Sequence, residues 1–569
     1  MTAKTKPKWT PEESAGLYGI RNWGAGFFDL NETGEVIVKA PFASGDVAVP
    51  ITDIVAGLEQ RGYAMPLLLR IENILDARIV TLNETFRSVL ATCGYSGEYR
   101  GVYPVKVNQQ CHVIEEITRF GTRYGHGLEA GSKAEMILAL ASLQNGGLLI
   151  LNGYKDEEFI DLGLSAICLG ISCFYVIESL NELPIIIERS KALGVKPMIG
   201  VRVKVSAKVA GQWTETTGDR SSFGLSTAQL VAVIDTLRQH DMLDCLQLLH
   251  CHLGSQIPDI ADIRAGVQEA ARFYAGLVEE GAAMGYLDLG GGLAVDYTGA
   301  NARQPSSRNY SLEDYVRAIA DTVRTALDPL EIRHPHIVTE SGRATVAHSS
   351  ILLFDVLDVQ HFEPVSLPEI LPDGVHPLIL RLFELYSAPF TSTPESAYNE
   401  ALACRDAVRA LFRSGRVPLR HRSISENLFL AVSQQVLKQF RRKSELPVAL
   451  AGVRESLSDI YYCNFSVFQS LPDTWAINQI FPIIPIHRLD EKPSREAILS
   501  DLTCDCDGKI DHFITGLGER PTLPVHDLRD DEDYLLGAFL VGAYQETLGD
   551  LHNLFGDTNV VSVRINQDG

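Results

Sequence analysis

Eight short apolar segments alternate with longer amphipathic segments over residues 101–340, and this alternation constrains the fold more than any other feature. The longer segments, such as SKAEMILALASLQN and SLEDYVRAIADTVRTAL, have the apolar spacing of helices. Strands that alternate with helices predict a parallel sheet, and eight units predict a closed (β/α)8 (TIM) barrel rather than a doubly wound sheet. The predicted strands are VYPVKV, HGLE, GLLILN, CFYVIE, MIGVRVKV, CLQLLHCH, GYLDL and HIVTE.

Polar or glycine residues stand at the carboxyl ends of these predicted strands. Barrel enzymes build their sites at that end of the barrel, from several different strands. We therefore expect these residues to face one shared pocket. In chain order they are Lys106, Glu129, Asn152, Glu178, Arg202 with Lys204, His252, Gly290 to Gly292, and Glu340.

Lys106 is the first candidate for chemistry. A lysine at the end of a strand is usually only solvated. If it is desolvated among apolar residues, it loses its proton and can form a Schiff base with an aldehyde. An aldehyde cofactor that carries a phosphate needs an anion cradle. The segment LDLGGGLAVDY places three glycines, Gly290 to Gly292, in the seventh strand–helix loop, where barrels often bind phosphate, although a glycine triplet also makes simple tight turns.

Two further segments contain polar groups that suit such a cofactor. In TESGR, Glu340 is suited to a pyridinium nitrogen and Arg343 to a phosphate, although the two also suit each other as an ion pair. In LLHCHLGSQI, His250 and His252 point to the same side of a strand, a spacing that also occurs in metal sites, but no third ligand has matching spacing. His252 can stack on an aromatic cofactor or be an ordinary barrel residue, and Ser255 can donate to a phosphate.

The overall composition excludes several classes of function. Hydrophobic residues make up 46% and charged residues 21%, as in globular proteins. The net charge of −22 disfavours nucleic acid and anionic lipid and favours small cations. No apolar stretch is long enough to span a bilayer, and the N-terminus lacks an apolar signal core, so we expect a cytoplasmic protein with its ten cysteines reduced.

The pattern changes on both sides of the barrel segment. Residues 1–95 contain a predicted β-hairpin around NETG, and residues 96–355 form the predicted barrel. A mainly β domain is predicted for 356–394 and 456–569, with strands in NFSVFQSLP, AILSDLTCDCDGKID and NVVSVRI, and we expect the N-terminal hairpin to pack on it. A basic helical insertion is predicted for 395–455.

Six segments, taken in order, resemble the fold-type III pyridoxal-phosphate-dependent decarboxylases of ornithine, lysine, arginine and diaminopimelate. They are YPVKVN, HLGSQI, GGGLAVDY, TESGR, CDCDG and GAYQETLGDLHNLFGD. The segments LYGIRNWGAGFFD and FQSLPDTWAINQIFPIIPI resemble the biosynthetic arginine-decarboxylating branch of that family. The resemblance covers nearly the whole chain and implies a barrel of the alanine racemase type with a second, β domain. It implies decarboxylation of arginine to agmatine with pyridoxal phosphate as cofactor.

The resemblance also implies a role for each matching residue. Lys106 would bind pyridoxal phosphate covalently, His252 would stack on its ring, and Glu340 would contact the pyridine nitrogen. Cys504 would donate a proton to the reacting carbon, while Asp505 and Glu129 would bind substrate. The phosphate would be held by Ser255, Gly290, Gly291, Gly292, Arg343 and Tyr544.

The resemblance further implies a homodimer or a dimer of dimers in which Cys504 and Asp505 reach the site of the partner subunit. A Mg²⁺ ion is expected only by resemblance, and no residue is assigned to it. The sequence departs from the family pattern at Cys506, where serine is usual, and at Ser222, where lysine is usual. Two alternatives stay open: a decarboxylase of ornithine, lysine or diaminopimelate, and a catalytically silent regulatory homologue. Retention of Lys106 and Cys504 disfavours the silent one.

Overall fold

A computed structural model describes residues 9–42, 44–206, 223–388, 393–440 and 450–568. Its central feature is a closed barrel of parallel strands, with the order β10-β11-β12-β5-β6-β7-β8-β9. All eight strands predicted from the sequence are confirmed. They are β5 (Tyr99–Pro104), β6 (Gly127–Ala130), β7 (Leu148–Leu151), β8 (Ser172–Ile177), β9 (Met198–Val203), β10 (Leu246–Cys251), β11 (Tyr286–Asp288) and β12 (His336–Thr339).

Helices cover the outside of the barrel, and a small apolar core fills its inside. Alternate residues of each strand point inward, so that the interior is packed rather than open. The inner core consists of Val102, Leu148, Ile150, Phe174, Val176, Leu248 and Val338. The covering helices are α5 (Cys111–Gly121), α6 (Lys133–Ser142), α7 (Glu157–Cys168), α8 (Glu182–Leu193), α9 (Thr227–Gln239), α10 (Ile260–Glu279) and α11 (Leu312–Leu327).

The eighth covering helix comes before the barrel in the chain. Helix α4 (Glu72–Thr92) packs on α11 and α5, so it belongs to the barrel layer and not with the N-terminal hairpin, where the sequence prediction for residues 1–95 placed it. The reason is topological. The barrel begins with β5, and the gap between the helices of its last and first units is closed by the helix that enters β5.

A second domain is organised around the long strand β13 (Ser350–Gln360), which is separated from the eighth barrel strand by one short helix and a 3-10 turn. On one side it pairs with β21 (Leu535–Phe539), and on the other with β4 (Leu67–Ile71) and, further along, with β14 (Asp459–Cys463). Strand β22 (Asn559–Val563) pairs with β4. The sheet also contains β15 (Ile483–Pro485), β16 (Arg495–Ser500), β17 (Lys509–Ile510) and β20 (Leu523–Val525), and β18 (Phe513–Thr515) pairs with β19 (Gly518–Arg520).

The structure confirms two of the three strand segments predicted for this domain and corrects the third. The segments NVVSVRI and AILSDL form β22 and β16. The segment NFSVFQSLP instead contains the helix α17 (Val467–Ser470), followed by α18 (Pro472–Ile477). The side chain of Ser466 accepts a hydrogen bond from the backbone of Gln469, and this N-cap overrides the strand preference of the aromatic residues.

The N-terminal segment combines helices with the predicted hairpin. Strands β1 (Phe28–Leu30) and β2 (Val36–Ala40) pair around NETG as expected, and β3 (Val47–Pro50) adds to β2. The start of that segment is helical instead, in α1 (Pro11–Tyr18) and α2 (Ile20–Trp23), and α3 (Ile51–Glu59) follows β3. The ring of Trp23 lies 4.9 Å from that of Phe539 on β21, so this segment packs on the β domain.

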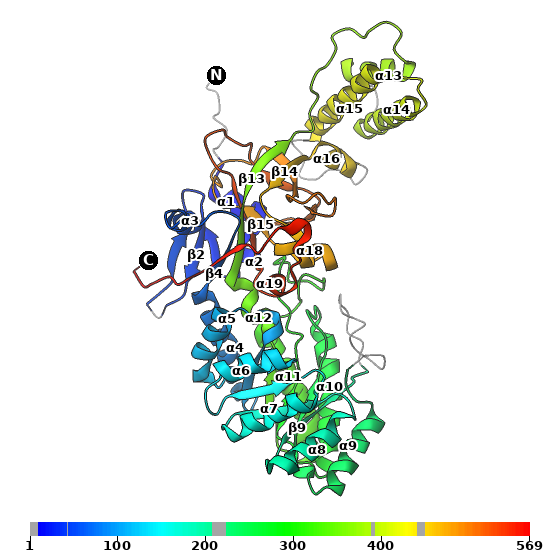
Figure 1. Ribbon diagram of the computed structural model, residues 1–569. Helices are drawn as coiled ribbons and strands as arrows, with labels where there is room; N and C mark the ends of the chain where they lie inside the picture. Colours follow the sequence, from blue (N-terminus) through cyan, green and yellow to red (C-terminus); the bar gives the residue numbers. More distant parts are fainter. Residues whose placement is uncertain (1–8, 43, 207–222, 389–392, 441–449, 569) are drawn as a thin grey trace.

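The helical insertion forms a separate bundle at one end of the molecule, with the β domain between it and the barrel (Figure 1). It has its own apolar core, to which α13 (Pro377–Ser387), α14 (Pro394–Arg413) and α15 (Leu419–Phe440) contribute, and α16 (Ala451–Leu457) packs on α15. Because α13 belongs to this core, the bundle begins before residue 395, earlier than the sequence predicted. No helix in the described part of the chain is long and apolar enough to cross a membrane.

His126 is a buried histidine of the barrel wall. It is packed so closely against Gly101 and Gly121 that a Cβ on either glycine would collide with its side chain, and neither ring nitrogen has a hydrogen-bond partner. Burial lowers the pKa of His126 from 6.5 to about 4. The unfolded chain therefore binds the proton more readily, and the stability that the neutral ring contributes is lost as the pH falls below 6.5.

We expect His126→Phe to be less sensitive to acid than the wild type. By linkage, the lowered pKa of His126 reduces the free energy of unfolding by about 2 kcal/mol from pH 8 to pH 5. Phenylalanine does not bind a proton, so it removes this loss, and no hydrogen bond of the ring is given up. The drop in melting temperature from pH 8 to pH 5 should therefore be smaller in the variant. The matched control His240→Phe, at an exposed position, should leave that drop unchanged. Equal drops in His126→Phe and the wild type would contradict the assignment.

Candidate functional site

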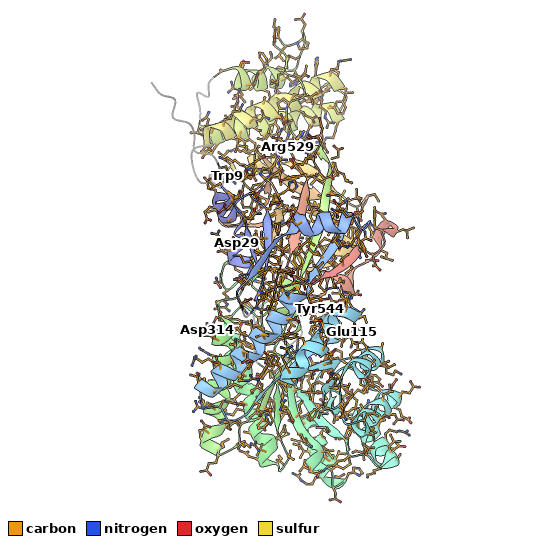
Figure 2. All side chains as sticks on the ribbon, turned by 90° about the vertical axis from the view of Figure 1, so that its left-hand side faces the viewer. Trp9, Asp29, Glu115, Asp314, Arg529 and Tyr544 are labelled. Carbon is orange, nitrogen blue, oxygen red and sulfur yellow. The ribbon has the colours of Figure 1, made fainter. Side chains whose placement is uncertain are left out.

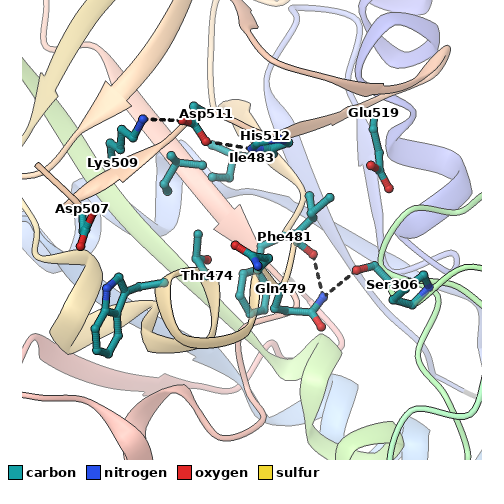
Figure 3. A pocket seen from close by; sticks show the side chains of 15 residues that line it. Ser306, Thr474, Gln479, Phe481, Ile483, Asp507, Lys509, Asp511, His512 and Glu519 are labelled. Carbon is teal, nitrogen blue, oxygen red and sulfur yellow. Dashed lines mark hydrogen bonds and ion pairs between the residues drawn. The ribbon is translucent and has the colours of Figure 1, made fainter. Parts of the chain in front are cut away.

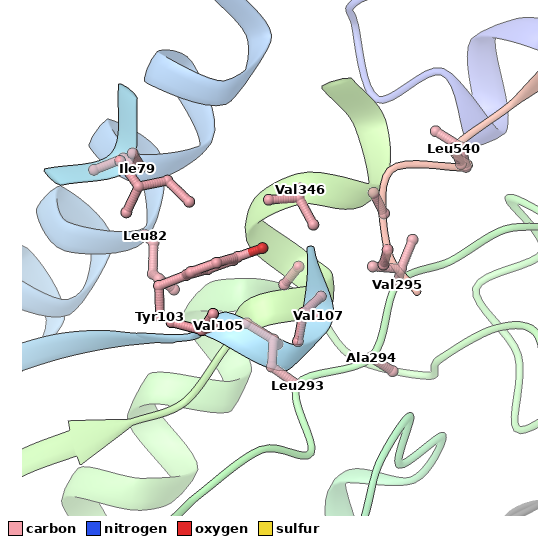
Figure 4. Packing of buried hydrophobic residues seen from close by; sticks show 14 of the residues in the cluster. Ile79, Leu82, Tyr103, Val105, Val107, Leu293, Ala294, Val295, Val346 and Leu540 are labelled. Atoms are coloured by element: carbon pink, nitrogen blue, oxygen red, sulfur yellow. The ribbon is translucent and has the colours of Figure 1, made fainter. Parts of the chain in front are cut away.

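A single 3-10 turn, η1 (Val105–Val107), holds the candidate lysine at the carboxyl end of β5. The side chains of Val105 and Val107 are buried in the main core, and Figure 4 shows them between the barrel and the elements above it. The side chain of Lys106 between them remains 52% exposed. The turn thus points two apolar side chains into the core and the intervening amine toward the barrel mouth.

Lys106 lies beside a buried carboxylate. Its Nζ is 3.3 Å from Oε2 of Glu129, whose side chain is only 1% exposed and whose two oxygens have no hydrogen bond. The charge of Glu129, then that of Glu340, raises the pKa of the Lys106 ammonium above its usual range. Of the two surroundings that the sequence left open for Lys106, an amine desolvated among apolar residues does not describe this site, because the neighbouring carboxylates favour the charged form.

Glu340 follows β12 and is almost completely buried. Asn152 Nδ2 donates to its Oε1 at 2.8 Å, and His250 Nδ1 lies 3.7 Å from the same oxygen. Burial, then the negative charges of Asp288 and Glu129, raises the pKa of Glu340 to about 8. Both contacts go to Oε1, and Glu340 is among the residues that line the cavity.

Arg343 lies in the short helix α12 (Gly342–Val346) and does not pair with Glu340. Its Nη1 donates to the hydroxyl of Tyr297 at 3.0 Å, and its guanidinium lies over the ring of Tyr544, 4.9 Å from the centroid. The sequence-based alternative of a Glu340–Arg343 ion pair is therefore wrong. Arg343 is a buried cation with neutral partners, and such a cation favours an anionic ligand.

The glycine triplet turns beside this arginine. Gly290 and Gly292 have φ angles of +62° and +114°, which side chains rarely adopt. A Cβ on Gly292 would also lie 2.9 Å from Ile257 Cδ1. The Gly290 N–H is bound to Asp288, while Gly291 and Gly292 line the cavity. This loop brings backbone close to whatever the cavity holds, as an anion cradle requires.

The two histidines of β10 have different environments. The pKa of His252 is well below its usual value because of burial, then the positive charges of Arg202 and Lys106, so its ring is neutral at the cavity wall. His250 lies deeper, with its Nδ1 2.8 Å from Asp288. The pair does not act as a two-histidine metal site, because His250 is committed to Asp288.

The structure brings most of the predicted site residues together around a cavity of about 140 Å³. The cavity lies at the barrel mouth under the β domain, where Figure 2 shows Tyr544. Gly290 and Glu129 lie directly beside the lining through their contacts with Glu340 and Lys106. The predicted residues in the lining are Lys106, His252, Ser255, Gly291, Gly292, Glu340, Arg343 and Tyr544.

The predicted residues Cys504 and Asp505 do not line this cavity. They are exposed on the loop between β16 and β17, where the Cys504 N–H donates to Asn553 Oδ1 at 2.9 Å and Asp505 lies 3.7 Å from His552. Ser222, the other departure from the family pattern besides Cys506, lies outside the described residues.

Several polar residues near the site could not be given a role from the sequence. Asn152 stands among the strand ends, but its bond to Glu340 crosses the barrel and has no sequence signal. Tyr297 and Gln256 were not identified, and Asp288 was overlooked although it stands two residues before the glycine triplet. Each of these residues contacts the site through a partner that is distant in sequence.

The β domain contains a larger cavity of about 610 Å³ (Figure 3). Its lining includes Asp507, from the same loop as Cys504, and Trp475. The charged groups Lys509, Asp511 and His512 are paired with one another there. Because the predicted cofactor-binding residues line the smaller cavity and not this one, we take the smaller cavity as the candidate active site.

The chain is similar to known proteins over its whole length. The family model described as pyridoxal-dependent decarboxylase, pyridoxal binding domain, matches residues 78–347, and the arginine decarboxylase helical bundle domain matches 372–452. The biosynthetic arginine decarboxylases of Gloeobacter violaceus and Synechococcus are 44% and 43% identical, over 98% and 99% of this chain and 87% and 88% of theirs. The crystal structure of the Campylobacter jejuni enzyme has a TM-score of 0.84 and 34% identity, covering 97% of this chain and 88% of that one.

We expect Glu129→Gln to make Lys106 more reactive in the cofactor-free protein. Because the charge of Glu129 raises the pKa of Lys106, its removal should lower that pKa and increase the fraction of neutral amine. If the pKa of Lys106 falls by about one, the rate of labelling near pH 8 should rise about tenfold. Peptide mapping after reaction with an amine reagent at several pH values measures this rate. Glu115→Gln, on the exposed side of α5, is the matched control, and equal rates in the two variants would refute the coupling.

Proposed function

The chain belongs to the biosynthetic arginine decarboxylases of the pyridoxal-dependent decarboxylase family. On that premise we propose that it converts L-arginine to agmatine and CO₂ in polyamine biosynthesis, with pyridoxal 5′-phosphate as cofactor. The observation that carries the proposal is the barrel mouth, where Lys106, Glu340 and Arg343 surround one cavity at positions that match the family motifs.

The residues of the cavity fit the cofactor in charge and shape. Arg343 is a buried cation without a carboxylate partner and has an unpaired Nε, as a phosphate site requires. Glu340 lines the cavity, and its side-chain contacts described above go to Oε1, which leaves Oε2 for a ring nitrogen. The neutral imidazole of His252 lies 3.5 Å from where a Cβ on Gly291 would stand, so its ring and the glycine loop flank the same space. Ser255 and Tyr544 complete the proposed phosphate contacts.

The chain's own residues have distinct roles in the proposed reaction. When bound, the cofactor withdraws electrons from the bond between the alpha carbon and the carboxylate of the substrate. Lys106 provides the amine that anchors the cofactor, and Glu129 holds the proton of that amine 3.3 Å away. The negative charge of Glu340 stabilises a protonated ring nitrogen. Arg343 and the glycine loop fix the phosphate end, so that the reacting bond stays in one orientation.

We assign the proton donor to Cys504 and a guanidinium contact to Asp505, both supplied by a partner subunit. Exposed apolar residues lie near the loop of Cys504: the buried ring of Phe468 packs on the exposed Trp475 and on His552, and the neighbouring Asn553 accepts from Cys504. A patch of this kind marks an interface. The patch consists of Trp475, Leu502, Leu548, Leu551 and Leu554. The cavity of about 140 Å³ is small for a ligand site, which supports completion by a second chain.

Two sequence-based alternatives are less well supported. A silent homologue is disfavoured because Lys106, Glu340 and Arg343 are placed together and Lys106 is accessible. A diaminopimelate specificity has little support. The solved structure of the diaminopimelate decarboxylase from m. jannaschi is 17% identical to this chain with a TM-score of 0.60, and a likeness at this level shows the fold alone. The whole-chain identity and the helical bundle both favour arginine.

Magnesium and location are further parts of the proposal. His250, Asp288 and Glu340 approach one another within 4.8 Å, but they are buried, and Mg²⁺ prefers oxygen ligands together with several waters. A Mg²⁺ requirement therefore rests on the family resemblance, with no residue assigned. A cytoplasmic location is supported by the ten cysteines, all of which are free.

We expect the purified protein to release CO₂ from arginine with a higher kcat/KM than from ornithine, lysine or diaminopimelate. Lys106→Ala should lower the rate by about three orders of magnitude or more, because the anchoring amine is lost. Carbon dioxide release from a panel of the four amino acids measures the preference. A kcat/KM for ornithine equal to or above that for arginine would overturn the assignment of substrate.

The shared site predicts complementation between two inactive variants. Lys106→Ala and Cys504→Ala should each be nearly inactive alone. After they are unfolded together and reassembled, half the dimers are mixed, and each mixed dimer has one intact and one doubly damaged site. Activity should then recover to about a quarter of the wild type. If wild-type protein refolds fully while the mixture stays inactive, Cys504 acts within its own chain.

A further inference from the structure

A buried histidine–aspartate pair lies behind Glu340 and has no role in the proposed reaction so far. His250 Nδ1 lies 2.8 Å from Asp288 Oδ2 and 3.7 Å from Glu340 Oε1. The side chain of His250 is 1% exposed, that of Asp288 is fully buried, and that of Glu340 is 4% exposed. Ionisable groups are rarely buried so completely unless they compensate one another.

The same pair is tied to the glycine loop by backbone hydrogen bonds. The other oxygen of Asp288 accepts from the Gly290 N–H at 2.9 Å, and the Gly290 carbonyl accepts from the Glu340 N–H at 2.7 Å. Asp288, Gly290, Glu340 and His250 therefore form a closed ring of contacts across β10, β11 and the end of β12. This ring contacts Glu340 through its backbone N–H and its Oε1, and does not use its Oε2.

The charges around this ring, together with burial, shift the pKa of Glu340. The pKa of His250 is raised: burial opposes the charged ring, but the Asp288 carboxylate outweighs it. The charge of Asp288 raises the pKa of Glu340 and His250 lowers it, so His250 offsets part of the effect of Asp288 on Glu340. The other charged groups that face Glu340 or His250 are Glu129 on β6, Lys106 on η1, Glu178 after β8 and Arg202 on β9.

We propose that His250 and Asp288 are positioning residues for Glu340: the pair holds it in place, and His250 offsets the charge of Asp288 so that Glu340 can give up its proton opposite the ring nitrogen of the cofactor. This inference rests on the proposed function, because it assumes that pyridoxal phosphate binds with its ring nitrogen toward Glu340. Neither residue touches the cofactor. The pair acts through the carboxylate that does.

The test is His250→Gln, which keeps an amide donor for Asp288 but cannot carry a positive charge. Asp288 is then left uncompensated beside Glu340, so Glu340 should keep its proton and the ring nitrogen should lose its own. We expect at least a tenfold loss of affinity when cofactor-free protein is titrated with pyridoxal phosphate. The nitrogen-15 chemical shift of labelled cofactor should also move toward that of an unprotonated pyridine. Circular dichroism and melting temperature confirm that the variant folds.

The double variant His250→Gln/Asp288→Asn separates charge compensation from simple packing. It removes both charges, so we expect it to bind the cofactor more tightly than His250→Gln and about as well as Asp288→Asn alone. A packing role would make the losses add instead. If His250→Gln does not fold, the cofactor affinities of the double variant and of Asp288→Asn are still compared. A much lower affinity in the double variant would contradict the inference. His240→Gln, at an exposed position, is the matched control.

Failure of this inference is distinguishable from failure of the proposed function. Borohydride reduction of the wild-type protein with pyridoxal phosphate should fix the label on Lys106. Without that label on Lys106, the proposed function and this inference both fail. If wild type is labelled there while His250→Gln keeps the same affinity and the same nitrogen shift, the inference alone is overturned.

Discussion

The backbone pairing between β5 and β12 is the interaction on which the site depends. Residues Ile337 to Thr339 pair in parallel with Tyr99 to Gly101, and this pairing joins the last strand of the barrel to the first. Because the strands are parallel, both continue toward the same rim, where Lys106 and Glu340 follow them. Two groups more than two hundred residues apart thus meet at one cavity because main-chain hydrogen bonds bring the two strand ends together.

Closure of the barrel also brings several carboxylates together in a buried region of the site. Glu129, Glu340 and Asp288 are buried within one region, and burial of carboxylates favours their neutral forms. The protein offsets these charges individually: Lys106 lies beside Glu129, and His250 lies beside Asp288. Glu340 accepts from the Asn152 amide and lies 3.7 Å from His250, and its raised pKa means that a cation in the cavity would favour its ionised form.

The β domain fixes the other side of the cavity through one carboxylate. Glu546 accepts two hydrogen bonds from the buried guanidinium of Arg70 and one from Asn108, two residues after the lysine. The backbone N–H of Tyr544 donates to the carbonyl of Val107 at 2.8 Å. These contacts hold Tyr544 over Arg343 and join the domain to the lysine turn. The loop of Cys504, by contrast, faces outward in the same domain, which is why we assign it to a neighbouring subunit.

The sequence by itself determined the barrel, because eight short apolar segments between helical ones have few other solutions, and the strand-end rule then located Lys106, His252 and Glu340. It also contained the motifs that match the family. It could not reveal that Lys106 is charged, that Arg343 bonds Tyr297 rather than Glu340, or that α13 belongs to the helical bundle. Those facts depend on which distant groups become neighbours. Burial and charge compensation act between such neighbours in space, and only the tertiary structure brings them together.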